Sequence, residues 1–206
     1  MRTESWLSGP PVPVHPRAQT ASSRYAFTVG FVGTLGSANA IETLIDAARL
    51  LSDHDIGFVL VGQGSEEEHL RALAADLRNV AFVGPVDKSE VPATLRGFDV
   101  CYVGYHESPL YRFGISPNKV FDYMAAGRPI VLAAAAANDP VRDAGCGLTV
   151  APDNPAVLAE AILALRALTP LERAALGANA RAYVEREHTY ATLARLYVQV
   201  LEGRVE

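Results

Sequence analysis

A lysine and an aspartate lie three residues apart in the segment Ser116–Asp122. Pro117 suits the first turn of a helix, where its missing amide hydrogen costs nothing, and Ser116 would then be the N-cap. The free amides of this turn and the Lys119 ammonium would attract an anion such as a diphosphate. One turn further on, the Asp122 carboxylate could accept hydrogen bonds from the two hydroxyl groups of a ribose. The spacing also fits a capped surface helix with an i, i+3 ion pair, which the segment taken alone favours.

Two short glycine loops, Gly33-Thr34-Leu35-Gly36 and Gly62-Gln63-Gly64, each follow an apolar run and precede a helical pattern. Because glycine has no Cβ, the backbone of such a loop can approach a phosphate, and the next helix can point its amide end at it. Neither loop has the spacing of a Gly-x-Gly-x-x-Gly fingerprint or of a Walker loop. The first loop fits phosphate contact and a tight turn about equally, and the second favours a plain turn.

The elements that would position these residues alternate between short apolar runs and amphipathic segments. The apolar runs predict strands at residues 27–32, 56–61, 80–83, 100–103, 129–132 and 148–150. The amphipathic segments predict helices at residues 41–51, 66–71, 87–95, 117–126, 158–165, 171–187 and 193–200. We expect Ser65 to cap the second helix and Asp87 or Ser89 to cap the third. We expect the last three helices to pack against the sheet.

Apolar runs of four to six residues between helices are typical of parallel strands that are buried on both faces. The sequence therefore predicts an α/β fold, a Rossmann-like doubly wound parallel sheet flanked by helices. Loops that follow the carboxyl ends of the strands lie on one rim of such a sheet, where ligands bind. Both glycine loops and the loop before Ser116 fall on this rim, which makes the rim a stronger candidate site than either loop alone.

Composition indicates a folded chain with no bulk attraction to nucleic acid or to an anionic membrane. Of its 206 residues, 50% are hydrophobic and 20% charged, and the formal net charge is −5. Residues 1–24 contain four prolines and predict a flexible tail or linker, whereas residues 25–206 predict one domain.

Cellular location is predicted from what the sequence lacks. Cys101 and Cys146 have no metal-site spacing and suit a reducing compartment. No apolar signal core follows Met1, and the longest apolar run, Ile130–Ala137, is too short to span a membrane. We therefore expect a cytoplasmic protein with no bound metal and no membrane span.

The run Gly114–Val131, with the sequence Gly-Ile-Ser-Pro-Asn-Lys-Val-Phe-Asp-Tyr-Met-Ala-Ala-Gly-Arg-Pro-Ile-Val, closely resembles the sugar-donor motif of glycosyltransferase family 4. The stretches at 32–36, 61–64, 80–84 and 147–150 resemble other parts of that family, so the match extends from about residue 26 to the end. The resemblance implies one half of a two-domain GT-B fold and transfer with retention. Bacterial amino-sugar transferases of surface-polysaccharide synthesis carry the same Ser-Pro-Asn-Lys form.

The resemblance also implies a role for each matching segment. The first glycine loop would contact the diphosphate, and the end of the third strand would line the base. The start of the helix at 117–126 would hold phosphate and sugar through backbone amides. Asp122 would bind the ribose. The residues that it places at the sugar donor are Gly33, Thr34, Leu35, Gly36, Gly62, Gly84, Pro85, Val86, Gly114, Ile115, Ser116, Pro117, Asn118, Lys119, Val120 and Asp122. Lys119 and Arg112 would supply the catalytic positive charge for the departing diphosphate.

The chain departs from the family pattern in two places. Many members have two acids eight residues apart, but Gly114 stands eight residues before Asp122, so Glu107 and Arg112 become candidates for the sugar contact. His106 beside Glu107 could also form an acid–base pair, although a loop pair is the simpler interpretation. Many members carry Arg and Lys after the first strand, where this chain has Thr34 and Asn39.

The resemblance implies a transferase that moves a sugar from a nucleoside diphosphate sugar to an acceptor hydroxyl in polysaccharide or glycoconjugate synthesis. A UDP-sugar follows from the amino-sugar resemblance, and no cofactor is expected. The family's N-terminal acceptor domain is absent from the chain, so a partner subunit or a further domain would complete the enzyme. The alternatives are a non-catalytic nucleotide-binding module, a subunit of a split transferase, and a nucleotide-sugar epimerase, against which the Ser-Pro-Asn-Lys-x-x-Asp form argues.

Overall fold

The computed structural model describes residue 18, residues 23–116 and residues 118–204. The predicted tail, apart from residues 18, 23 and 24, and the predicted helix-start residue Pro117 lie outside the described residues. The element bounds are β1 Phe27–Val32, η1 Ser37–Asn39, α3 Ile41–Leu50, β2 Ile56–Val61, α4 Glu67–Leu73, β3 Val80–Val83, α5 Val91–Arg96, β4 Val100–Gly104, η2 Pro109–Phe113, α6 Asn118–Ala125, β5 Ile130–Ala133, α7 Pro140–Ala144, β6 Gly147–Val150, α8 Pro155–Ala167, α9 Pro170–Glu187 and α10 Tyr190–Leu201.

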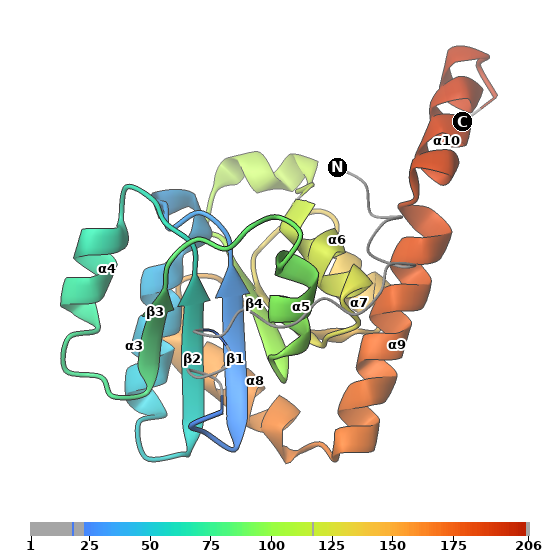
Figure 1. The fold of residues 1–206 in the computed structure, drawn as a ribbon. Helices are drawn as coiled ribbons and strands as arrows, with labels where there is room; N and C mark the ends of the chain where they lie inside the picture. Colours follow the sequence, from blue (N-terminus) through green and yellow to red (C-terminus); the bar gives the residue numbers. More distant parts are fainter. Residues whose placement is uncertain (1–17, 19–22, 117, 205–206) are drawn as a thin grey trace.

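The six strands form one sheet in the order β3-β2-β1-β4-β5-β6, and every neighbouring pair is parallel. The strand order reverses between β1 and β4, which is the point where doubly wound sheets bind ligands. The carboxyl ends of β1, β2 and β3 point to the upper edge in Figure 1, so the loops that follow them share one rim. The predicted doubly wound parallel sheet is confirmed.

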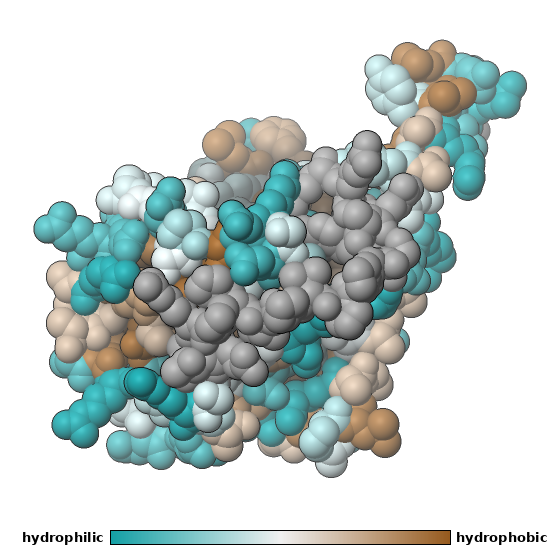
Figure 2. Space-filling model, in the orientation of Figure 1, coloured by the Kyte–Doolittle hydropathy of each residue, from teal (hydrophilic) through white to brown (hydrophobic). Residues whose placement is uncertain are grey.

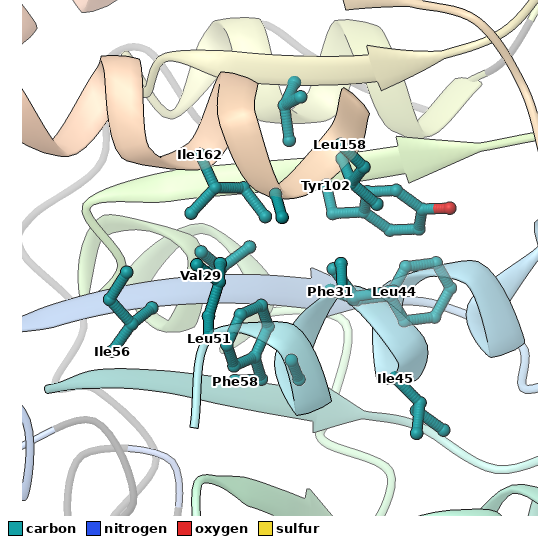
Figure 3. Close-up of a cluster of buried hydrophobic side chains, with 14 of the residues drawn as sticks. Val29, Phe31, Leu44, Ile45, Leu51, Ile56, Phe58, Tyr102, Leu158 and Ile162 are labelled. Carbon is teal, nitrogen blue, oxygen red and sulfur yellow. The ribbon is translucent and has the colours of Figure 1, made fainter. Parts of the chain in front are cut away.

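Helices cover both faces of the sheet. On one face, α3, α4 and α8 bury apolar side chains against alternate residues of β1, β2 and β4. Figure 3 shows Val29 and Phe31 of β1 between Leu44 of α3 and Leu158 of α8. On the other face, α5, α6, α7 and α9 cover the remaining strand side chains, such as Cys101. Burial on both faces explains why the strands are continuous apolar runs rather than alternating ones.

Two predicted helix caps are wrong. The N-cap of α4 is Glu66 and that of α5 is Glu90, and neither uses a side-chain cap hydrogen bond. The Glu66 amide donates to Leu35 O in the first glycine loop at 2.9 Å, so the chain turns once more after Ser65 before α4 begins. This long-range bond replaces the local cap that the sequence favours.

The last helix does not pack against the sheet as predicted. Helix α10 has no buried residue, and it projects away from the rest of the domain beyond α9 (Figure 1). Aliphatic side chains appear in brown on it in Figure 2. The exposed large hydrophobic residues of α10 are Tyr190, Leu193, Leu196, Tyr197, Val198, Val200 and Leu201. Both sheet faces are already covered by the earlier helices, so no sheet surface remains for α10. No helix in the described part of the chain is both long and apolar enough to cross a bilayer.

Candidate functional site

The two glycine loops form a continuous hydrogen-bonded edge at the rim. The Gly33 amide donates to Val61 O at 2.9 Å and the Leu35 amide donates to Gln63 O at 3.0 Å, which extends the pairing of β1 with β2. Gly62 has a φ of 141°, and a Cβ at this position would lie 1.9 Å from Gly33 O. Glycine is therefore required at position 62 by the close approach of the two backbones.

A pocket of about 270 Å³ opens beside these loops, and we call it the loop pocket. Its lining residues are Val32, Gly33, Thr34, Val61, Gly62, Gln63, Pro85, Val86 and Val91. Five of these residues were predicted to contact the sugar donor, namely Gly33, Thr34, Gly62, Pro85 and Val86. They come from three separate segments of the chain and meet in one pocket at the rim.

A second pocket of about 450 Å³ lies between the start of α6 and the junction of α9 with α10, and we call it the helix pocket. Its lining residues are Ile115, Ser116, Asn118, Phe121, Asp122, Asn138, His188, Tyr190 and Leu193. Four further predicted residues line it. The predicted residues that line neither pocket are Leu35, Gly36, Gly84, Arg112, Gly114, Lys119 and Val120.

Lys119 extends from the first turn of α6 toward the first glycine loop. Its Nζ donates a hydrogen bond to Asn39 Oδ1 and lies 4.9 Å from the centroid of the Phe31 ring. It would also lie 3.8 Å from a Cβ placed on Gly33. Burial lowers the pKa of the Lys119 ammonium to about 8, so the group remains mainly charged at neutral pH. The structure thus places Lys119 next to the backbone of the first glycine loop, which the sequence predicted to contact a phosphate.

Asp122 faces the helix pocket rather than Lys119. None of the ion pairs among the described residues joins these two side chains, so the alternative of an i, i+3 ion pair is wrong. Burial raises the pKa of the Asp122 carboxyl to about 6, and the positive charge of Lys88 opposes that rise. Lys119 and Asp122 consequently lie at two neighbouring parts of the rim.

Tyr123 fastens α6 to the end of β1. Its hydroxyl donates to Val32 O at 2.9 Å and accepts from the Val32 amide at 2.9 Å. Burial raises the pKa of the Tyr123 hydroxyl well above its ordinary value, so it keeps the proton that it donates. Tyr123 is buried, and the sequence gave no sign of these hydrogen bonds because Val32 is 91 residues away.

Asn138 holds the loop that leads into α6. Its Oδ1 accepts from the Ile115 amide at 2.7 Å, and its Nδ2 donates to Ile115 O at 2.8 Å. Gly114 has a φ of 98°, and a Cβ there would lie 2.9 Å from Asn138 Oδ1. An acid at position 114 would therefore be strained in this loop conformation. No sequence motif pointed to Asn138.

Arg112 lies away from both pockets. It is exposed on η2, and its guanidinium carbon lies 4.6 Å from the centroid of the neighbouring Phe113 ring. Glu107 is also exposed, and its amide donates to Asp153 Oδ2 at 2.8 Å. The structure does not bring either candidate to the Lys119 side chain.

His106 pairs with Asp153 and not with Glu107. Its Nδ1 lies 2.6 Å from Asp153 Oδ1, and its Nε2 lies 4.0 Å from Glu42 Oε2. A pair of His106 with Glu107, as an acid–base pair or as a loop pair, is therefore not observed, and His106 is exposed. In the described ranges, no group of three or more His, Cys, Asp or Glu residues has the arrangement of a metal site.

His188 is a pocket residue that the sequence did not single out. Its ring stacks on Phe121 with centroids 3.9 Å apart and planes inclined by 27°, and it lines the helix pocket. Burial lowers the pKa of the His188 imidazole, which favours the neutral ring in this stack. His188 is also the C-cap of α9, and its amide donates to Val184 O.

A parallel sheet with a glycine loop, a helix start and a lysine on its carboxyl rim defines a Rossmann-like domain. Residues 26–167 match the family described as Glycosyl transferases group 1, and the chain belongs to that family.

Two curated relatives are glycosyltransferases by name. The chain is 31% identical over 122 residues to the putative teichuronic acid biosynthesis glycosyltransferase TuaH of Bacillus subtilis, a match that covers 56% of this chain and 29% of TuaH. It is 26% identical over 167 residues to the probable glycosyltransferase WbjE of Pseudomonas aeruginosa, covering 76% of this chain and 41% of WbjE. The chain therefore spans less than half the length of these relatives.

Solved structures of similar fold are GT-B transferases. Anabaena HepE in complex with UDP-glucose superposes with a TM-score of 0.75 at 20% identity, covering 98% of this chain and 56% of HepE. The C-terminal domain of the group 1 glycosyl transferase LpcC of Francisella tularensis has a TM-score of 0.70 at 17% identity, covering 92% of this chain and 99% of that domain. The predicted fold, one Rossmann-like half of a GT-B architecture, is confirmed.

Proposed function

We propose that this chain is the donor-binding part of a retaining, family 4-like glycosyltransferase that transfers a sugar from a UDP-sugar to an acceptor hydroxyl in polysaccharide or glycoconjugate synthesis. Family membership and the names of TuaH and HepE support this proposal. The observation that carries it is the position of Lys119, whose ammonium lies at the start of α6 beside the first glycine loop.

In this proposal the departing diphosphate is stabilised by charge that is already in place. The positive end of α6 and the Lys119 ammonium would face the developing negative charge. The loop pocket would hold the nucleotide between the glycine loops and the Pro85–Val86 segment. Asp122 would accept hydrogen bonds from the ribose hydroxyls and would transfer no proton, and no metal or other cofactor takes part.

Arg112 is proposed as the second positive charge, and it has less structural support than Lys119. Its side chain stacks on Phe113 outside both pockets, so it would reach the diphosphate only after the loop between β4 and α6 moves. An Arg112→Gln variant that keeps full transfer activity would remove this assignment while leaving that of Lys119 intact.

The acceptor-binding part is proposed to lie in a further domain or in a partner subunit, in the cytoplasm. The relatives are more than twice as long as the segments that this chain matches, and α10 exposes a row of apolar side chains that a second domain could cover. Turnover by the chain only after a second protein is added would show a split enzyme. Donor binding without turnover under all conditions would instead show a nucleotide-binding module.

The test is nucleotide binding by the 206-residue chain, measured by calorimetry and by thermal shift, with UDP, GDP, ADP and their glucose and N-acetylglucosamine derivatives. We expect UDP compounds to raise the melting temperature by mass action. Lys119→Met should weaken UDP binding about tenfold, which corresponds to the loss of one charge-assisted hydrogen bond. Arg195→Gln, which removes an exposed positive charge on α10, is the matched control.

Two outcomes would refute the proposal. The absence of a shift with every nucleotide would remove the donor site, and equal affinities of Lys119→Met and Arg195→Gln would remove the role of Lys119. Conversion of a UDP-sugar to its epimer without an acceptor would identify the epimerase alternative.

A further inference from the structure

A polar pocket of about 310 Å³ lies at the edge of the sheet opposite the rim, and we call it the arginine pocket. Its lining residues are Arg96, Asp99, Ala126, Gly127, Arg128, Pro129, Pro170, Arg173 and Ala174. Asp99 directly precedes β4 and Pro129 directly precedes β5, so the pocket lies at the amino ends of the strands. It is therefore separate from the loop and helix pockets, which lie at the carboxyl ends.

The arginine pocket concentrates positive charge in an acidic chain. Among the described residues, three guanidinium groups and one carboxylate line it, which leaves an excess of two positive charges, whereas the whole chain has a net charge of −5. The single carboxylate is already engaged. Asp99 Oδ2 accepts from the Thr28 amide at 2.9 Å, and Asp99 Oδ1 lies 4.0 Å from Arg173 Nη2. The pocket consequently has more cations than its own anion can pair.

Protein groups pair the guanidinium groups of this pocket only in part. Arg173 Nη1 donates to Leu168 O, and Arg128 Nη2 donates to Arg96 O, which anchors both side chains. The Arg128 Nε is buried with no hydrogen-bond partner among the described residues. The Arg96 guanidinium makes no hydrogen bond or ion pair with any other described residue. The arrangement is thus preorganised but incompletely paired.

The proximity of these cations is unfavourable in the absence of an anion. Burial lowers the pKa of the Arg128 guanidinium from its ordinary value, the neighbouring Arg96 lowers it further, and the negative charge of Asp99 opposes this. A partly buried positive charge without a full set of partners destabilises a protein. An anion in the pocket would offset both the desolvation of Arg128 and its repulsion with Arg96.

The first turn of α9 adds to the attraction for an anion. Pro170 and Arg173 of this turn line the pocket, and the helix continues for 18 residues, so the positive end of its dipole lies at the pocket. Glu172, the acid of the same turn, is engaged in the capping box, where its carboxylate accepts from the Thr169 amide and hydroxyl.

We propose that the arginine pocket binds a phosphate group, as free phosphate or as a small soluble phosphomonoester. A phosphate dianion matches the excess of two positive charges, and guanidinium groups bind its oxygens in paired hydrogen bonds. The half-buried position of the three arginines and the pocket volume fit a small soluble ligand. This inference does not depend on the proposed transferase activity.

The test is binding of inorganic phosphate and of glycerol 3-phosphate to the 206-residue chain, measured by calorimetry and by thermal shift. Sodium chloride at matched ionic strength serves as the reference. We expect saturable binding of at least one probe, and about tenfold weaker binding in Arg96→Gln, which removes a side chain that makes no hydrogen bond with another described residue. Arg195→Gln removes a comparable charge far from the pocket and should bind as the wild type does.

A Lys119→Met variant separates this pocket from the rim. The proposal expects Lys119→Met to bind phosphate like the wild type, because Lys119 lies at the opposite edge of the sheet. The proposal is overturned if neither probe binds saturably, if Arg96→Gln and Arg195→Gln bind equally well, or if phosphate binding is lost in Lys119→Met and kept in Arg96→Gln. Loss of UDP binding in the Lys119 variant alone concerns the proposed transferase and leaves this inference intact.

Discussion

Replacement of Asn138 should loosen the loop before α6 without unfolding the domain. Its side-chain amide makes both a donated and an accepted hydrogen bond with the backbone of Ile115, at 2.8 Å and 2.7 Å. Asn138→Ala removes both bonds. Asn138→Asp keeps an acceptor for the Ile115 amide but places a second oxygen against Ile115 O, where the native side chain donates. Both variants should therefore release the loop.

The magnitude follows from the two bonds. A neutral hydrogen bond contributes about 0.5–1.5 kcal/mol, and exposure of Asn138 favours the lower half, so the pair should hold the loop by about 1–2 kcal/mol. This free energy corresponds to a factor of about 5–30 in the population of the open loop. Hydrogen exchange of the Ile115 amide, read by NMR, should accelerate by that factor in Asn138→Ala.

The affinity for UDP provides a second measurement of how firmly Asn138 holds the loop before α6. If Ser116 and the start of α6 hold the diphosphate as proposed, UDP should bind about 5–30 times more weakly to Asn138→Ala, because binding must now also order the loop. Asn179→Ala is the matched control, since the Asn179 side chain also bonds to a loop backbone, donating to Gly145 O at 3.1 Å. Equal Ile115 exchange rates in the wild type and in Asn138→Ala would refute the reasoning.

Three further variants test the rim. Gly62→Ala should destabilise the domain by about 1–3 kcal/mol in urea denaturation, because its Cβ would meet Gly33 O and its φ is positive; an unchanged midpoint would contradict this. Tyr123→Phe should lose about 1–2 kcal/mol by the same measurement, since both Val32 bonds vanish and the ring remains; a loss below about 0.3 kcal/mol would contradict it. Because burial raises the folded-state pKa of Asp122 to about 6, its stabilising contribution is complete below the unfolded pKa near 3.8 and is lost as pH rises through about 6. Asp122→Asn should therefore gain stability relative to the wild type between pH 4 and pH 7 in the same denaturation series, and a pH-independent difference would refute this assignment.

Strands and most helices were predictable because their signals are local. The predicted strands at 27–32, 56–61 and 80–83 have the observed bounds of β1, β2 and β3, since a buried parallel strand is an uninterrupted apolar run between turn residues. The rim position of the glycine loops followed from the same pattern, because parallel strands all end on one side of the sheet. Leu148–Val150, the weakest of these runs, also forms a strand, at the sheet edge.

The contacts that shape the candidate site were not predictable, because they join distant parts of the chain. Tyr123 and Val32 are 91 residues apart, Lys119 and Asn39 are 80 apart, and Asn138 and Ile115 are 23 apart. Helix periodicity placed Lys119 and Asp122 on one side of a helix, but the Lys119 ammonium bonds to Asn39 and the Asp122 carboxylate faces the helix pocket. The alternative of an ion pair between them is wrong for this reason.

The sequence by itself determined the doubly wound sheet, the order of its elements and the family resemblance of the segment around Ser116, because apolar period and motif spacing are properties of neighbouring residues. Only the tertiary structure decided which residues meet at the rim, that Gly114 has a positive φ beside Asn138, and that α10 has no buried residue. An apolar helix face predicts a packing partner, but whether another element of the chain lies close enough to be that partner depends on the packing of all the other elements. The three arginines gather at the amino edge for the same reason, since α5, α6 and α9 bring them there from separate parts of the chain.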